Sequence, residues 1–203
     1  MIYSSERGIL FTHVSRTGGT AITECLRREL PNLVDLLGQH APLLLAKPIL
    51  GSTFQDAFKF AIVRNPWDRF VSWYALIGKT QLGDTIADPD HAHWQAFDDF
   101  LEKWAADQYE VDGVRRRSLS QWAQLSDLEG KLLTDNIGRF ETLNDDFNRI
   151  IKKFGLSSTI LSLVNESPRQ HYSVYYSNLG RELVGYYFRH DVDGFGYCFE
   201  TDS

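Results

Sequence analysis

One short segment combines residue types that can bind a phosphate group. Residues 15–20 read Ser-Arg-Thr-Gly-Gly-Thr and follow a run of apolar residues. Paired glycines let the backbone come close to a ligand and turn consecutive N–H groups toward phosphate oxygens. Arg16 adds a fixed positive charge, and Thr17 and Thr20 add hydroxyl donors. Taken alone, the segment is equally typical of an ordinary strand-to-helix turn in which the glycines only make the turn tight.

A second segment predicts another anion site. The apolar residues at 58–63 are typical of a parallel strand buried on both faces, and this run ends at Arg64. Asn65 suits a helix N-cap and Pro66 the first helical position. We expect Ser72 to lie on the side of this helix away from its aromatic face, where it and Arg64 can reach one anion. Singly, Arg64 is also compatible with a surface ion pair and Ser72 with a solvated position.

Two anion sites at two strand ends suit a nucleotide that carries phosphates on both its 5′ and 3′ sides. A Walker A loop requires a lysine followed by serine or threonine after its last glycine. In this chain Gly19 is followed by Thr20 and Ala21. The sequence therefore disfavours a simple triphosphate site.

Both segments are placed by the elements that hydrophobic periodicity predicts. A strand over 9–14 precedes the first segment, and apolar residues then recur at helical spacing. We expect helices whose core faces contain Ala21, Ile22, Cys25, Leu26 and Leu30; Phe70, Trp73, Tyr74 and Ile77; Phe97, Phe100, Leu101 and Trp104; Phe147, Ile150, Ile151 and Phe154; and the residues around 179–188.

These segments resemble those of a known family. HVSRTGGT at 13–20 is similar to the 5′-phosphosulfate loop, and AIVRNPWDRFVSWY at 61–74 to the 3′-phosphate motif, of sulfotransferases that use 3′-phosphoadenosine 5′-phosphosulfate (PAPS). The carbohydrate type, which includes heparan sulfate 2-O-sulfotransferase and bacterial relatives, is the most similar. Further resemblance lies at 39–41, 137–147, 163–176 and 191–200.

The resemblance implies a role for each matching residue. It assigns the 5′-phosphosulfate to Thr17, Gly18, Gly19 and Thr20, the 3′-phosphate to Arg64 and Ser72, and further cofactor contacts to Arg16, Ala21, Ser167 and Tyr172. Ala21 stands where the family usually has serine and therefore offers no hydroxyl.

The same resemblance names two catalytic residues. His40 is the expected general base, because a histidine that titrates near neutrality can take the proton of an acceptor hydroxyl. Without the resemblance, His40 reads as a polar residue ahead of Pro42. Arg16 stands at the family's lysine position, where it can stabilise negative charge but is a poor proton donor. No metal ion is required.

The implied fold is an α/β, P-loop-like three-layer domain with a mainly parallel central sheet and helices on both faces. We expect one domain over 1–203, since the chain is 43% hydrophobic and can bury a sizeable core. The net charge of −6 disfavours nucleic acid and heavily sulfated polyanions as partners. A hydroxyl of a carbohydrate is the expected acceptor.

Other features are secondary. We expect His13 to hold structure beside the first segment, the pair His91 and His93 to be solvated rather than to bind metal, and the basic run 115–117 to be a solvated turn or a site for an acidic acceptor. Two cysteines, and neither a signal-peptide pattern nor a long apolar stretch, favour a soluble, cytoplasmic, bacterial-type enzyme.

Two other functions remain open. The first is an ATP- or GTP-dependent phosphotransferase of related fold, which would bind a triphosphate with magnesium. The second is a non-catalytic nucleotide- or glycan-binding protein, which the arginine at position 16 would suit. The acceptor's identity and the oligomeric state are not predicted.

Overall fold

The computed structural model describes residues 1–81, 94–105, 120–162 and 170–201. Internal contacts divide the chain into two units. The sheet unit contains residues 1–64 and 121–165, and the helical unit contains residues 65–120 and 166–203. The expectation of one domain over the whole chain stays a prediction.

A five-stranded sheet forms the centre of the sheet unit, in the order β3-β1-β2-β4-β5. Parallel ladders join β2 to β4 and β4 to β5, whereas β1 runs antiparallel to both of its neighbours. β2, β3, β4 and β5 therefore run in one direction and β1 runs in the other, which confirms the predicted mainly parallel sheet. The strand β1 was not predicted, because three residues are too few to show a period. The strands are β1 (Ile2–Ser4), β2 (Ile9–Thr12), β3 (Val34–Asp35), β4 (Phe58–Val63) and β5 (Asn136–Arg139).

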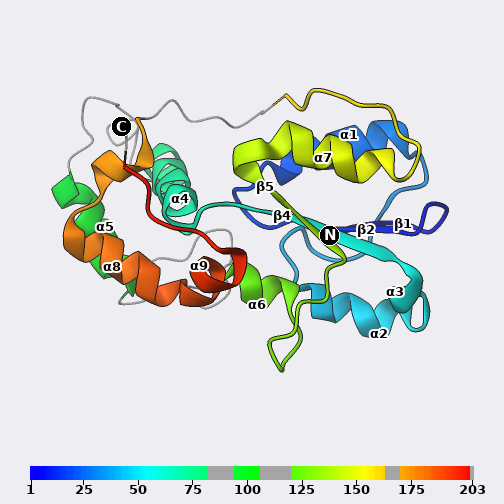
Figure 1. The fold of residues 1–203 in the computed structure, drawn as a ribbon, viewed down its shortest axis with the longest axis horizontal. Helices are drawn as coiled ribbons and strands as arrows, with labels where there is room; N and C mark the ends of the chain where they lie inside the picture. Colours follow the sequence, from blue (N-terminus) through cyan, green and yellow to red (C-terminus); the bar gives the residue numbers. More distant parts are fainter. Residues whose placement is uncertain (82–93, 106–119, 163–169, 202–203) are drawn as a thin grey trace. The chain divides into compact units, whose positions relative to one another are not determined.

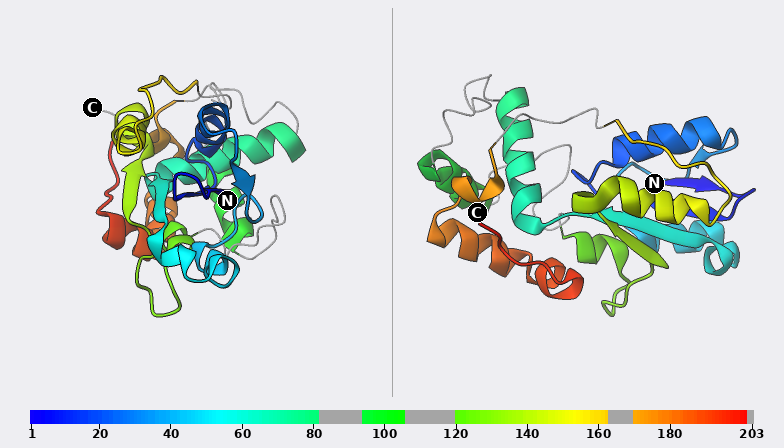
Figure 2. Two further views of the ribbon diagram at one scale, coloured as in Figure 1. Left: turned by 90° about the vertical axis from the view of Figure 1, so that its right-hand side faces the viewer. Right: turned by 45° about the horizontal axis from the view of Figure 1, so that its top comes forward.

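Helices cover both faces of this sheet, as expected for a three-layer α/β unit. One face carries α1 (Gly19–Glu29) and α7 (Leu143–Lys152), and the other carries α2 (Ala46–Leu50) and α3 (Thr53–Asp56) (Figure 1). Figure 2 shows the same arrangement from two further directions. The sheet unit also contains α6 (Gln121–Leu125) and the short 3-10 helices η1 (Leu43–Leu45) and η5 (Phe140–Thr142).

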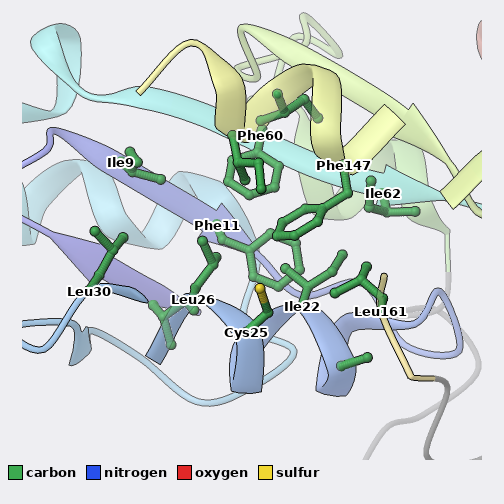
Figure 3. Packing of buried hydrophobic residues seen from close by; sticks show 14 of the residues in the cluster. Ile9, Phe11, Ile22, Cys25, Leu26, Leu30, Phe60, Ile62, Phe147 and Leu161 are labelled. Carbon is green, nitrogen blue, oxygen red and sulfur yellow. The ribbon is translucent and has the colours of Figure 1, made fainter. Parts of the chain in front are cut away.

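Alternation along the strands divides the apolar residues between two cores. In β2, Ile9 and Phe11 belong to the cluster beneath α1 and α7, whereas Leu10 belongs to the cluster beneath α2 and α3. Figure 3 shows Phe11, Phe60 and Phe147 meeting in the first cluster, with Cys25 of α1 beside them. The prediction that the strand at 58–63 is buried on both faces is confirmed, because every residue of β4 after Phe58 is buried.

Aromatic side chains form the core of the helical unit. Phe70 of α4 lies against Trp104, Phe100 and Phe97, with the Phe70 and Trp104 ring centroids 4.7 Å apart. The predicted core faces of α4 and α5 are confirmed for the residues whose side chains are described; Ile77 lies outside them. The unit consists of α4 (Pro66–Gln81), α5 (Trp94–Ala105), η6 (Tyr172–Tyr175), α8 (Asn178–Tyr187) and α9 (Arg189–Phe195).

The predicted start of α4 is also confirmed. Asn65 is its N-cap residue, since its Oδ1 accepts a hydrogen bond of 3.1 Å from the Trp67 N–H, and Pro66 is the first helical residue. Within the part of the chain that the structure describes, no helix is long and apolar enough to span a bilayer.

Candidate functional site

Parallel pairing of β2 with β4 places the ends of the two predicted segments side by side. Phe11 lies opposite Phe60, and Thr12 lies opposite Ala61. The chain that leaves β2 toward α1 and the chain that leaves β4 at Arg64 therefore emerge at the same edge of the sheet. Ligands of α/β sheets bind at this carboxyl edge.

The segment at 15–20, here called the diglycine loop, presents a helix N-terminus. Gly18 is the N-cap of α1 and has a φ of 77°, which glycine adopts without a steric penalty. The first-turn N–H groups of a helix have no acceptor within the helix, and a glycine N-cap offers no side chain to replace one. No acidic residue lies in the first turn of α1. This end of α1 is suited to an anion.

The side chains of Thr17 and His13 shape the diglycine loop from inside. The Thr17 hydroxyl is fully buried and donates a hydrogen bond of 2.8 Å to the Val14 carbonyl, so its proton is used within the loop. The His13 ring packs against Gly19 so closely that a Cβ at position 19 would overlap it. The first glycine of the pair is thus required by its φ, and the second by this close approach.

The side chain of Arg64 reaches the diglycine loop. Its Nη1 donates a hydrogen bond of 3.0 Å to the carbonyl of Arg16, and its guanidinium carbon lies 3.8 Å from the centroid of the Phe140 ring. Arg64 is 6% exposed, so its side chain is buried and does not lie at the surface. Arg16 has a φ of 63°, unusual for a residue with a side chain, and it turns its carbonyl toward Arg64.

The backbone of Arg64 is fixed as well. The Arg64 N–H donates to Oε1 of Gln121 at 2.9 Å, and the Gln121 Nε2 donates back to the Arg64 carbonyl at 2.8 Å. Gln121 is fully buried. Neither Gln121 nor Phe140 was predicted from the sequence as a site residue. Phe140 lies within the segment 137–147, which carries part of the family resemblance.

His40 lies beside His13, with a defined tautomer. Its Nδ1 is 3.0 Å from the His13 carbonyl oxygen, which can only accept, so Nδ1 carries the proton. In the neutral ring the lone pair is then on Nε2. The two rings meet edge to face with centroids 4.8 Å apart. An acceptor at Nδ1 is the arrangement in which a histidine can act as a general base through its other nitrogen. The role of His40 as the base stays a prediction.

Two glutamines hold this pair of histidines. The Gln39 Nε2 donates to Nδ1 of His13 at 3.0 Å, which confirms the structural role expected for His13. The Gln124 Nε2 donates to the carbonyls of His13 and His40, at 3.2 and 3.1 Å. Gln124 was also not predicted from the sequence as a site residue.

The environment of His13 keeps its ring neutral. Burial, together with the neighbouring His40 and the chain's amino group, lowers the pKa of His13 from 6.5 to about 3. Because His13 packs on Gly19, the uncharged ring adds no positive charge beneath the loop. The charge offered to an anion at this edge of the sheet comes from the arginines and the N-terminus of α1.

The remaining predicted residues lie elsewhere. The side chain of Ala21, on α1, packs into the core between this helix and the sheet, so only its backbone N–H can face a ligand. Ser72 is buried, not solvated, on α4 of the helical unit. In the same unit the Tyr172 hydroxyl accepts hydrogen bonds from the Glu200 N–H and the Asn65 amide, at 2.7 and 3.4 Å. The cofactor roles of Ser72 and Tyr172 stay predictions. Ser167, His91, His93 and the basic run 115–117 lie outside the described residues.

The sheet unit therefore joins an anion-binding helix terminus, a buried arginine and a histidine with a defined tautomer. This combination suits transfer of an anionic group to a hydroxyl. A family model described as the Sulfotransferase family matches residues 1–197, and the chain belongs to this family. Sulfuryl transfer is accordingly the reaction class. No curated protein and no solved structure matches the chain at a significant level.

The neutral His13 predicts a specific dependence of stability on pH. Below pH 6.5 the unfolded chain binds a proton at this position, whereas the folded chain does not until about pH 3. The free energy of unfolding should therefore fall as the pH falls through this window. We expect His13→Gln to flatten this decline, measured as the urea midpoint at several values between pH 7.5 and 5.

His190, an exposed residue of α9, provides the matched control. His190→Gln should retain the wild-type slope. If His13→Gln also retained that slope, the pKa of His13 would not be lowered in the folded protein.

Proposed function

We propose that this protein transfers a sulfuryl group from PAPS to a hydroxyl of a carbohydrate acceptor. The observation that carries the proposal is the hydrogen bond from the Arg64 guanidinium to the carbonyl of Arg16. It places a buried cation against the loop at the N-terminus of α1. A helix N-terminus alone suits any anion, but a second, separate cation suits a nucleotide with phosphates at both of its ends.

In this proposal the two ends of PAPS bind to different groups. The N–H groups of Gly19, Thr20 and Ala21 and the Thr20 hydroxyl bind the 5′-phosphosulfate. Thr17 contributes through its backbone, because its hydroxyl donates to Val14. Arg64 binds the 3′-phosphate. A guanidinium has five N–H donors, so it can bind a phosphate while it keeps its hydrogen bond to the loop.

His40 acts as the general base. As the acceptor oxygen forms a bond to sulfur, its proton passes to Nε2 of His40, and the bond from sulfur to the bridging oxygen of the 5′-phosphate breaks. The leaving group is adenosine 3′,5′-bisphosphate. Arg16 stabilises the negative charge that develops on the bridging oxygen and gives up no proton, because the pKa of a guanidinium is too high.

The acceptor class is supported by family resemblance and by charge. The segments at 13–20 and 61–74 most resemble those of carbohydrate sulfotransferases, whose acceptors are sugar hydroxyls. A net charge of −6 disfavours a long polyanion, which needs an extended basic surface. A short or weakly charged glycan is therefore the proposed acceptor.

Nucleotide selectivity tests the donor. A ligand that binds only the folded state raises the melting temperature by mass action. Adenosine 3′,5′-bisphosphate should raise it more than AMP or ATP at equal concentration, and the shift should persist in EDTA. Arg64→Ala should weaken binding of the bisphosphate, measured by calorimetry, by about 10- to 100-fold, as expected for a lost charged hydrogen bond.

Arg28→Ala removes the same charge from an exposed position on α1 and serves as the control. Its affinity should stay within about twofold of the wild type. Equal melting shifts with AMP and the bisphosphate would show that no group binds the 3′-phosphate.

Replacement of the base should act on turnover alone. In His40→Ala no imidazole takes the acceptor proton, and kcat for sulfation of a model sugar with PAPS should fall by about 100-fold or more. The affinity for adenosine 3′,5′-bisphosphate should change little, because the proposal assigns His40 to the acceptor and not to the nucleotide. An unaltered kcat would exclude His40 as the base.

A further inference from the structure

We propose that α6 is a positioning element in which Gln121 sets the place of Arg64 and Gln124 sets the orientation of His40. The inference deepens the proposed function and rests on it. The Gln121 amide bonds to the backbone of Arg64, and the Gln124 amide bonds to the carbonyls of His13 and His40, so each acts through another residue. The consequence is that one short helix fixes the donor-binding arginine and the base relative to each other.

Gln121 extends the sheet by one residue. The ladder between β4 and β5 ends where Val63 lies opposite Arg139. At the next residue, the N–H and the carbonyl of Arg64 bond to the two ends of the Gln121 amide, as they would to a neighbouring strand. The two hydrogen bonds to Gln121 therefore continue the pattern of the ladder at Arg64, one residue beyond its end. The direction in which its side chain leaves the backbone follows from this.

Gln124 acts on His40 through a shared carbonyl. The His13 carbonyl oxygen accepts one hydrogen bond from the His40 Nδ1 and another from the Gln124 Nε2. A carbonyl oxygen has two lone pairs, so both of them are used. The same Nε2 also holds the backbone carbonyl of His40. Gln124 thus fixes the acceptor that selects the tautomer of His40 and the backbone from which its ring projects.

The helix that carries the two glutamines is itself anchored. Residues three apart lie on the same face of a helix, so both amides point toward the ends of the strands. The Trp122 indole donates to the Gly130 carbonyl at 3.0 Å, and the Leu133 N–H donates to the Leu125 carbonyl at 2.9 Å. The turn that follows α6 is thereby tied back to it, and the helix can serve as a fixed support.

The alternative is that both amides merely satisfy buried backbone groups. In that case each substitution would lower stability and impair every property of the site together. A positioning role predicts instead that the two glutamines affect different properties. Methionine has nearly the shape of glutamine but makes no comparable hydrogen bond, so Gln→Met isolates the amide.

Gln121→Met should impair the donor site. We expect the dissociation constant of adenosine 3′,5′-bisphosphate to rise about tenfold, while the NMR titration of the His40 ring is unchanged. Gln124→Met should leave that dissociation constant within about twofold of the wild type and lower kcat about 10- to 100-fold.

The Gln124→Met variant should also shift the titration of His40. Without the Gln124 amide, the His13 carbonyl accepts a hydrogen bond from the His40 Nδ1 alone. That hydrogen bond becomes stronger and favours the charged form of the His40 ring. The apparent pKa of His40, and with it the acid limb of the kcat profile, should move upward. Gln124→Asn keeps an amide that is one carbon shorter; it should fold and show a smaller shift in the same direction. Gln55→Met, on an exposed position of α3, is the control and should change nothing.

The two proposals fail in different ways. If the wild type does not bind the bisphosphate, the proposed function fails, but the His40 titrations still test the helix. If the wild type binds it and Gln121→Met and Gln124→Met change affinity, turnover and the His40 titration alike, or change none of them, the positioning role is overturned. If Gln124→Met fails to fold, a Gln124→Asn titration identical to the wild type overturns it.

Discussion

The hydrogen bond between the Arg64 guanidinium and the Arg16 carbonyl is the contact on which the site depends. It requires the parallel pairing of β2 and β4, which brings both chains to one edge of the sheet. It also requires the left-handed backbone of Arg16, which turns the carbonyl inward. The Gln121 amide holds the backbone of Arg64. The Phe140 ring lies against the guanidinium itself. A buried cation without such partners would be costly.

A second constraint acts on His40, the proposed general base. The His13 carbonyl assigns the proton of His40 to Nδ1, while the His13 ring packs on Gly19 of the loop. One residue thus connects His40, the proposed general base, with the helix terminus proposed to bind an anion. Because burial keeps the His13 ring neutral, this connection is made without a competing positive charge. The loop and the base are parts of one arrangement at the end of β2.

The sequence predicted those parts of the fold that local pattern specifies. The core face of α1, the buried strand β4 and the capped start of α4 follow from periodicity and from Asn-Pro chemistry, and all three are confirmed. The sequence did not reveal β1, which is too short to show alternation, or the roles of Gln121 and Gln124. Their amides act on backbone atoms from residues distant in the chain, and no local pattern encodes such contacts. Ser72 on α4 is buried, which excludes the solvated position considered for it, and its role in binding the 3′-phosphate stays a prediction.

The most direct test of the central claim is a crystal structure of the protein with adenosine 3′,5′-bisphosphate. We expect the 5′-phosphate at the N–H groups of Gly19 and Thr20, and the 3′-phosphate within about 3 Å of the Arg64 guanidinium. A complex in which the 3′-phosphate lies away from Arg64, while that guanidinium still contacts only the protein, would contradict it.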